Sequence, residues 1–298
     1  MRSRRRRLAR RGYAVLRGFL NPAEVEAARA GAAGLTPATA APACARPHNL
    51  LFPLRFDDRL VDLFLGDAAR RDRIGGVTAA SDLRFISAYL SVKEPGSGAL
   101  WWHQDWWCWD HPVTYHRPAP QVAVLCALHD TDRRHGGLRV LPGSHARSVP
   151  LHALLPDGHA DDRHADDHSH PVVRDHPDQV TVALRAGDAV VLDYRLLHGT
   201  HPHGGEARRD CVLLTFTPAW AALPRDIRGH LIRHPALPAD GDAPSTVSWA
   251  GTLLPAFDGF RRDLPLSRDA PASFLLGHRP TCLAPPGNPQ RPANVRTP

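Results

Sequence analysis

The segment WWHQDWW places a histidine and a carboxylate two residues apart, at His103 and Asp105. Residues i and i+2 of a β-strand point to the same face, so a strand here would present the two side chains together. Imidazole and carboxylate are both common metal ligands. A histidine beside tryptophan is more often a packed ring than a ligand, however. A metal site therefore requires a third ligand from elsewhere in the chain.

His198 is the candidate third ligand. It follows the strand-like run DAVVLD, within the segment GDAVVLDYRLLHGTHPH. His201 and His203 compete for the role, but His198 lies closer to the predicted strand end. Two histidines and one carboxylate on one face of a metal leave three positions open, as in non-haem Fe(II) oxygenases. Zinc more often completes a closed tetrahedral site.

Arg209 strengthens this interpretation. It begins the strand-like run CVLLTFTP, and a guanidinium there could hold a carboxylate through two parallel hydrogen bonds. The co-substrate 2-oxoglutarate needs such a cation for its C5 carboxylate, since its other end chelates iron. Arg208 is the alternative if the register differs by one residue. A metal-binding cupin without oxygenase activity would have no need of this arginine.

Five segments together resemble the phytanoyl-CoA dioxygenase family over roughly residues 11–220. They are GYAVLRGFLNPAEVEAAR, HQDW, DTDRRHGGLRVLPGSH, AGDAVVLDYRLLHGT and Arg209. The resemblance implies a mainly β fold with flanking helices around a double-stranded β-helix (jelly-roll or cupin-like) core. It also implies an Fe(II)-dependent dioxygenase that consumes 2-oxoglutarate and O₂ and oxidises a small molecule, releasing succinate and CO₂.

The resemblance also implies residue roles. His103, Asp105 and His198 match the catalytic iron ligands, Arg209 matches the residue that binds the C5 carboxylate, and Gln104 and Thr200 match further 2-oxoglutarate contacts. Halogenating relatives replace the carboxylate ligand with a small residue, so Asp105 favours hydroxylation, desaturation or ring formation. Hydroxylation of an unactivated C–H bond, in natural-product biosynthesis, is the expected reaction. The turn that contains His145 is a family hallmark, and we expect a structural role for that histidine.

The remaining pattern predicts the elements that position these residues. Six runs rich in Val and Leu, bounded by Gly, Pro and Asp, predict strands at 83–92, 121–129, 138–141, 180–184, 188–193 and 211–217. Before them, Asn21, Pro22 and Glu24 predict a capped helix to about residue 30. A second helix is expected at 57–65, and a loop at 35–48. The oxygenase domain should span residues 12–220.

The flanking segments have distinctive compositions. Seven of the first eleven residues are arginines and account for the net charge of +7, so residues 1–11 are expected to be a disordered basic arm. Residues 152–178 are dense in His and Asp and predict an irregular insertion without a second metal site. Residues 221–298 should pack on or cover the core, with Trp249 and Phe257 as contacts. Alternate members of the tryptophan cluster at 101–109 should line the active-site pocket.

Composition limits the other function classes. No run approaches the ~20 apolar residues of a membrane helix, and the apolar segment after the basic run is too interrupted for a signal peptide. The five cysteines form no CxxC pair, which favours free thiols in a reducing, cytoplasmic location. The arginine-rich arm could contact nucleic acid, but no basic surface interleaved with aromatic residues follows it. The expected partner is therefore a small-molecule substrate, without nucleic acid or membrane.

Overall fold

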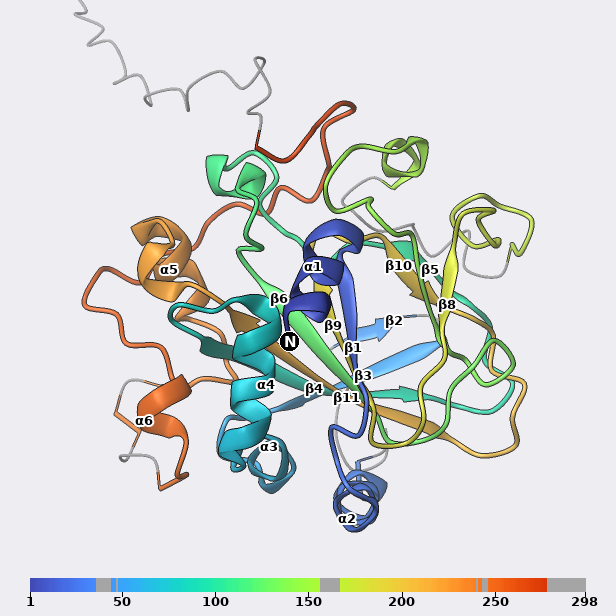
Figure 1. The fold of residues 1–298 in the computed structure, drawn as a ribbon, viewed down its shortest axis with the longest axis horizontal. Coiled ribbons are helices and arrows are strands. Elements are labelled where there is room, and N and C mark those ends of the chain that lie inside the picture. Colours follow the sequence, from blue (N-terminus) through green and yellow to red (C-terminus); the bar gives the residue numbers. More distant parts are fainter. Residues whose placement is uncertain (36–43, 47, 156–166, 240, 243–245, 278–298) are drawn as a thin grey trace, which may run out of the picture.

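Two antiparallel β-sheets form the centre of the protein (Figure 1). The structure is a computed structural model that describes residues 1–35, 44–46, 48–155, 167–239, 241–242 and 246–277. The larger sheet has the strand order β1-β9-β6-β11-β4-β3-β2 and the smaller sheet has the order β5-β10-β7-β8. Residues from both sheets line one internal cavity, as in a jelly roll. The predicted double-stranded β-helix core is confirmed.

The strands follow the alternation of the sequence closely. All six predicted strands are present, at β4, β6, β7, β8, β9 and β11, with ends shifted by one or a few residues. The bounds of the larger sheet are β1 (Tyr13–Leu16), β2 (Cys44–Arg46), β3 (Asn49–Leu54), β4 (Arg84–Lys93), β6 (Val122–Ala127), β9 (Ala189–Asp193) and β11 (Arg209–Thr217). Those of the smaller sheet are β5 (Leu100–His103), β7 (Leu138–Val140), β8 (Val180–Val182) and β10 (His198–Thr200).

Four helices precede or interrupt the first strands: α1 (Arg2–Arg11), α2 (Pro22–Ala33), α3 (Arg59–Leu65) and α4 (Ala68–Thr78). The predicted cap of α2 is confirmed: the Asn21 side chain accepts from the Glu24 amide, and the Glu24 carboxylate accepts from the Asn21 amide. The loop expected at 35–48 contains β2, which pairs with β3. The pairing is tertiary, which is why local composition did not predict it.

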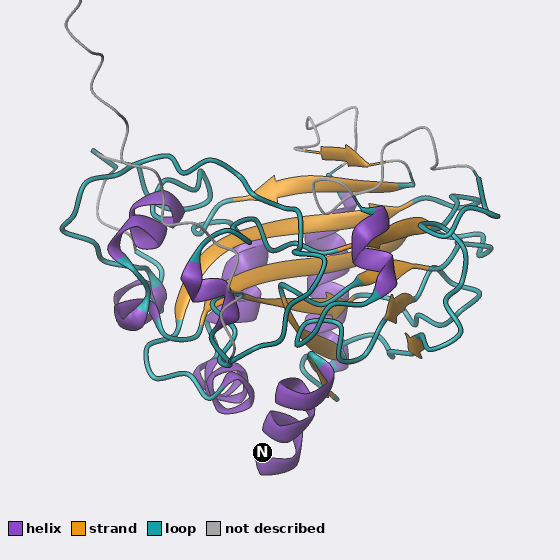
Figure 2. Cartoon of the chain, turned by 90° about the horizontal axis from the view of Figure 1, so that it is seen from above, coloured by secondary structure: helices purple, strands orange, loops and turns teal. Residues whose placement is uncertain are grey.

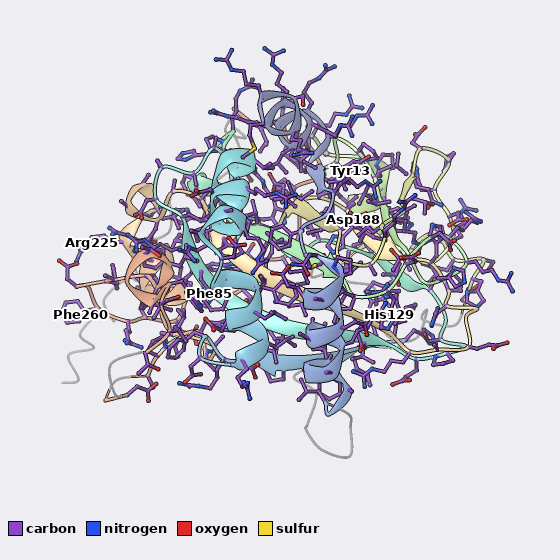
Figure 3. All side chains as sticks on the ribbon, turned by 60° about the horizontal axis from the view of Figure 1, so that its bottom comes forward. Tyr13, Phe85, His129, Asp188, Arg225 and Phe260 are labelled. Carbon is purple, nitrogen blue, oxygen red and sulfur yellow. The ribbon has the colours of Figure 1, made fainter. Side chains whose placement is uncertain are left out.

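The first eleven residues are not disordered, and this prediction is wrong. They form α1, whose Leu8 is buried and whose end is capped by Gly12 in the left-handed conformation, with φ of 81°. Arginine is a good helix former, and Arg10 and Arg11 lie where the helix dipole favours cations. Figure 3 shows the arginine side chains radiating outward from this helix, just before Tyr13.

The helices pack outside the strands (Figure 2). α1 contacts α4, and α3 contacts both α2 and α4. Their apolar residues join the main hydrophobic cluster with the larger sheet, through side chains such as Val25, Phe64 and Ile74. Burying apolar area in this way supplies the main favourable term in folding. The helical layer therefore covers the sheet face that does not line the cavity.

The segment after β11 returns along the core. It contains the short helices η5 (Trp220–Ala222), α5 (Arg225–Leu231) and α6 (Ala250–Leu253), and Figure 1 shows α5 and α6 on one flank of the sheets. Trp249 is fully buried against Phe85 of β4, with ring centroids 5.5 Å apart, and its indole donates to Asp62. Phe257 is half-buried beside Trp220. The described part of this segment thus shares the core, while the division at residue 220 stays a prediction.

Within the part of the chain that the structure describes, no helix combines the length and the apolarity needed to cross a bilayer. Three of the described cysteines, Cys108, Cys126 and Cys211, are buried free thiols. The side chains of the other two cysteines, Cys44 and Cys282, are outside the part of the chain that the structure describes.

Candidate active site

His103, Asp105 and His198 converge at one end of the smaller sheet. Their ligand atoms all lie within 4.8 Å of one another, and they are the only such metal-ligand group among the described residues. The two histidine rings meet because β5 and β10 are antiparallel neighbours, with His198 directly opposite His103. Their centroids are 4.1 Å apart.

Backbone carbonyls orient both imidazoles. The Nδ1 atom of His103 lies 3.0 Å from the Trp101 carbonyl, and that of His198 lies 3.0 Å from the Leu196 carbonyl. A carbonyl only accepts, so each Nδ1 carries the proton and each Nε2 presents a lone pair. Those Nε2 atoms are the ones nearest the Asp105 carboxylate, at 3.9 and 3.5 Å. This matches the way metal-binding histidines are usually held in one tautomer.

Asp105 reaches the site differently from the way the sequence predicted. Strand β5 ends at His103, so the two residues are not an i, i+2 pair within one strand. The backbone amides of Asp105 and Trp106 both donate to the Tyr194 carbonyl, at 3.0 and 2.9 Å. A tertiary hydrogen-bond pair, and not strand alternation, therefore aims this carboxylate at the histidines.

The competing histidines point elsewhere. His201 shares a hydrogen bond with the Thr181 hydroxyl at 2.8 Å, and His203 donates to the Ala207 carbonyl at 2.7 Å. Burial lowers the pKa of His201 to about 4, which keeps its ring neutral. His145 hydrogen-bonds the Ala9 carbonyl in α1 at 3.3 Å. None of the three lies in the metal-ligand group.

A cavity of about 420 Å³ extends from this group between the two sheets. Arg209, the first residue of β11, lines it and is almost fully buried. One of its Nη atoms donates to the Gly136 carbonyl, but its Nε has no hydrogen-bond partner among the described residues. Burial lowers the pKa of Arg209 because the charged form loses hydration. An unmatched buried donor on a cavity wall fits a carboxylate ligand.

Thr200 and Arg208 show which side chains near the start of β11 face the cavity. Thr200 lines the same cavity, and its hydroxyl accepts from the Leu100 amide at 3.3 Å. Arg208 faces the opposite side: it pairs with Asp210 at 2.7 Å and donates to carbonyls at the end of α2. Adjacent strand residues point to opposite faces, so only Arg209 can serve the cavity.

Lys93 is a second cation near Arg209. The two residues are opposite one another on β4 and β11. The Lys93 ammonium is buried and donates to the carbonyls of His48 and Gly98. Burial, followed by the neighbouring charges of Arg209 and Arg139, lowers its pKa to about 7. Near neutral pH Lys93 therefore carries only part of a positive charge, and it does not line the cavity, so Arg209 is the main cation at this end.

Gln104 makes a contact that the sequence did not predict. Its amide nitrogen donates to the Arg268 carbonyl at 3.0 Å, and Gln104 is not among the cavity-lining residues. One N–H of this amide is thus directed to Arg268, and because Gln104 does not line the cavity, this geometry gives no support to a contact with 2-oxoglutarate. Gln104 instead fastens the C-terminal segment beside the metal-ligand group.

The opposite end of the cavity is lined by residues that the sequence did not single out. They come from β4 and from the segment after β11: Tyr89, His230, Leu231, His234, Leu266 and Arg268. Trp107 is the one member of the tryptophan cluster on the lining, and the other four are buried in hydrophobic clusters. The expectation that alternate tryptophans line the pocket is therefore wrong. Only the pairing of distant segments brings these residues together, so no local signal could have identified them.

The His- and Asp-rich insertion is described at 152–155 and 167–178, while residues 156–166, including His164, lie outside the described residues. Its second part is more integrated than expected. Val172 and Val173 are buried, and the Trp102 amide donates to the Val172 carbonyl. Asp175 pairs with Arg133 and Arg139. The absence of a second metal site remains a prediction.

The comparisons with known proteins agree with this geometry. Residues 8–211 match the family model for phytanoyl-CoA dioxygenase (PhyH). None of the curated proteins is significantly similar to the chain. Among solved structures, the fold resembles that of HygX from Streptomyces hygroscopicus with nickel, 2-oxoglutarate and hygromycin B bound. That likeness has a TM-score of 0.51 at 19% identity and covers 73% of this chain and 87% of HygX.

Two further structures are similar. AviO1 from Streptomyces viridochromogenes Tue57 has a TM-score of 0.50 at 21% identity, over 75% of this chain and 96% of AviO1. SnoN, a non-haem 2-oxoglutarate-dependent epimerase from nogalamycin biosynthesis, has a TM-score of 0.50 at 21% identity, over 89% of this chain and 97% of SnoN. At such identities the likeness establishes a shared fold.

Proposed function

Because the chain belongs to the phytanoyl-CoA dioxygenase family, and is therefore a 2-oxoglutarate-dependent non-haem iron oxygenase, we propose that His103, Asp105 and His198 hold its Fe(II). The donor set fits: two neutral imidazoles and one carboxylate leave open positions for a chelating co-substrate and O₂. Bound iron, with 2-oxoglutarate and O₂, supplies the oxidising power to break a C–H bond. The protein supplies position, charge and exclusion of water.

Arg209 is proposed to bind the C5 carboxylate of 2-oxoglutarate. The observation that carries this assignment is that Arg209 lines the cavity and that its buried Nε has no hydrogen-bond partner among the described residues. A carboxylate there would satisfy the donor and neutralise a buried cation. The Thr200 hydroxyl lies on the same wall and can donate to the same carboxylate. Lys93 lies opposite Arg209 outside the cavity and, with a pKa of about 7, adds at most part of a charge.

The reaction is proposed to be hydroxylation of an unactivated C–H bond in a small metabolite. With iron bound, Asp105 would be a ligand in the place that a halide would need, which argues against halogenation. Natural-product biosynthesis is supported by the fold likeness to HygX and SnoN, whose names refer to hygromycin B and nogalamycin. The protein's part is to hold the reacting carbon near the metal while apolar walls keep water away.

An anaerobic titration tests the proposal. Fe(II) and then 2-oxoglutarate are added to the apoprotein, and the weak visible charge-transfer band of the chelate is recorded. We expect one Fe(II) per chain and a band that saturates with one 2-oxoglutarate. Succinate release is then assayed with a metabolite panel. Iron binding without the band would reject the co-substrate assignment and return the metal-binding cupin as the better explanation.

A further inference from the structure

The cavity has two chemically different ends. Along β11 the residues that line it are Arg209, Cys211 and Leu213, and the residues of β4 opposite the last two are Ser91 and Tyr89. A strand rises ~3.4 Å per residue, so Leu213 and Tyr89 lie well over 10 Å from Arg209 along the sheet. The proposed 2-oxoglutarate site occupies the Arg209 end. The Tyr89 end is thereby left for the substrate.

The segment at residues 262–268 forms part of the wall beside His230, whose Nδ1 accepts from the Leu264 amide at 3.1 Å. It is fixed at both ends by backbone hydrogen bonds: the Arg262 amide donates to the Gly229 carbonyl at 3.1 Å, and the Trp109 amide donates to the Ser267 carbonyl at 2.8 Å. The Ser267 amide donates in turn to the Trp107 carbonyl at 2.8 Å. Leu266 and Arg268 flank that paired residue and both line the cavity. Their placement is therefore built into the fold.

Among the cavity-lining residues only three carry a charge: Asp105, Arg209 and Arg268. The first two belong to the proposed metal and co-substrate sites. The two lining histidines outside the metal-ligand group, His230 and His234, add no charge, because burial lowers the pKa of each, that of His234 to about 4. Arg268 is thus the single charge that the described wall offers to a substrate.

Resting on the proposed function, we propose that Arg268 binds an anionic group of the substrate, and that this substrate is a compact, largely apolar molecule with one carboxylate, sulfonate or phosphate. No hydrogen bond or ion pair of the Arg268 side chain is recorded with a described residue. It is partly buried at the cavity wall, where a low local dielectric strengthens an ion pair. The anion would meet Arg268 while the remainder extends toward the metal.

Apolar and aromatic side chains define the rest of this end. Trp107 stacks on His230 with ring centroids 4.3 Å apart, and Leu213 and Leu231 complete the wall. The whole cavity measures about 420 Å³ and must also hold 2-oxoglutarate, so the enclosed part of the substrate is small. A polycationic substrate is disfavoured, because it would meet Arg268 and find no carboxylate beyond Asp105 on the described lining.

One polar pair adds directionality. His234 Nδ1 accepts from the Ala236 amide at 3.1 Å, so Nε2 carries the proton and donates to the Tyr89 oxygen at 2.9 Å. This fixes the Tyr89 hydroxyl beside Leu213 on the cavity wall. The pair thus places a polar group on an otherwise largely apolar part of the wall.

The test uses matched naphthalene probes with the anaerobic Fe(II)–2-oxoglutarate holoenzyme. Dissociation constants of 2-naphthoate, its neutral 2-naphthamide and the cation 2-naphthylmethylammonium are measured by calorimetry. We expect 2-naphthoate to bind at millimolar concentrations or below, and on the order of five-fold tighter than the amide. The ammonium probe should bind weakest. Naphthalene-2-sulfonate and 2-naphthyl phosphate distinguish which anion the site prefers.

Two variants assign the preference to the residue. Arg268→Gln should bring the acid and the amide to within about two-fold of each other, while Arg262→Gln should keep the wild-type preference. Arg262 is an exposed arginine of the same segment that does not line the cavity. Neither variant should change the charge-transfer band of bound 2-oxoglutarate.

Several results would overturn the proposal. They are failure of 2-naphthoate to bind at millimolar concentrations, equal affinity for acid and amide, tightest binding of the ammonium probe, or an acid preference that survives in Arg268→Gln. The charge-transfer band is recorded before any probe is added. Its absence would reject the proposed function, whereas a normal band without acid preference would reject only the role of Arg268.

Discussion

The two ends of the cavity differ in how they are built. Arg209 and Thr200 stand on paired strands of the two sheets, where backbone hydrogen bonds set each position. Leu266 and Arg268 stand on an irregular segment that returns from the C-terminal side and is held by a few hydrogen bonds. The proposed co-substrate contacts thus stand on paired strands, whereas the proposed substrate contact stands on an irregular segment. Mutations at the two ends should therefore affect different properties of the protein.

The largest effect is expected at the metal. His198→Ala should remove Fe(II) binding and reduce succinate formation to background, because two remaining ligands do not define a stable site. Metal content after anaerobic reconstitution measures this directly. His201→Ala and His203→Ala are the matched controls, since both side chains bond elsewhere. If His198→Ala kept full iron content and His201→Ala or His203→Ala lost it, the residue changed in that control would be the ligand instead of His198.

Arg209→Ala should weaken 2-oxoglutarate binding by ~3–5 kcal/mol while iron binding is retained, since it leaves a buried carboxylate without its cation. Arg209→Lys should recover part of the affinity, because it restores the charge but not the forked geometry. The measurement is the 2-oxoglutarate dependence of the charge-transfer band. Arg208→Ala should bind normally, because this side chain pairs with Asp210 outside the cavity. Unchanged affinity in both alanine variants would contradict the co-substrate site.

Trp249→Ala tests whether the substrate end folds together with the co-substrate end. The indole is fully buried against Phe85 and bonds Asp62, so truncation should cost ~3–5 kcal/mol of unfolding free energy. Denaturant unfolding followed by fluorescence and by circular dichroism should give one coincident transition. Two separate transitions, with the β-sheet signal unchanged, would show that the C-terminal segment is an independent unit.

The His234–Tyr89 pair predicts a pH dependence. Burial lowers the folded-state pKa of His234 to about 4, below the ~6.5 of the unfolded chain. The unfolded state therefore binds the proton more readily between these values, so this stability is fully present above ~6.5 and is lost as the pH falls toward 4. His234→Gln should flatten the slope of unfolding free energy between pH 7 and 5 by at most about 1.4 kcal/mol per pH unit. Tyr89→Phe, which removes the partner but not the titrating ring, should retain the slope.

The smallest effect is expected at Gln104. Gln104→Met keeps the volume but removes the hydrogen bond to the Arg268 carbonyl, at a cost of about 1 kcal/mol in stability. Affinity for 2-oxoglutarate should stay within about two-fold of wild type, while proteolysis of the segment around Arg268 should accelerate. A large loss of 2-oxoglutarate affinity would instead support the co-substrate contact that the sequence resemblance implies.

The sequence alone determined the residues whose types and spacing carry shared chemistry. His103, Asp105, His198 and Arg209 lie within or beside strands that the alternation of apolar and polar residues predicts. The Asn21 cap of α2 was also predicted from the sequence. The jelly-roll core followed from the same pattern together with the family resemblance. The composition of residues 1–11 gave a wrong prediction. The charge suggested disorder, but the segment forms a helix with Leu8 buried and Gly12 as its C-terminal cap.

Only the tertiary structure decided which histidine faces Asp105, which face of β11 meets the cavity, and which residues line the proposed substrate end. Asp105 is aimed by the Tyr194 carbonyl, and Arg268 is carried to the cavity by pairing with residues far away in sequence. Such contacts depend on long-range backbone hydrogen bonds and packing. They produce no periodic pattern of apolar residues in the segments that make them. Local sequence patterns predict which segments form helices and strands with an apolar face. Which elements pack against one another depends on the tertiary contacts of the whole core.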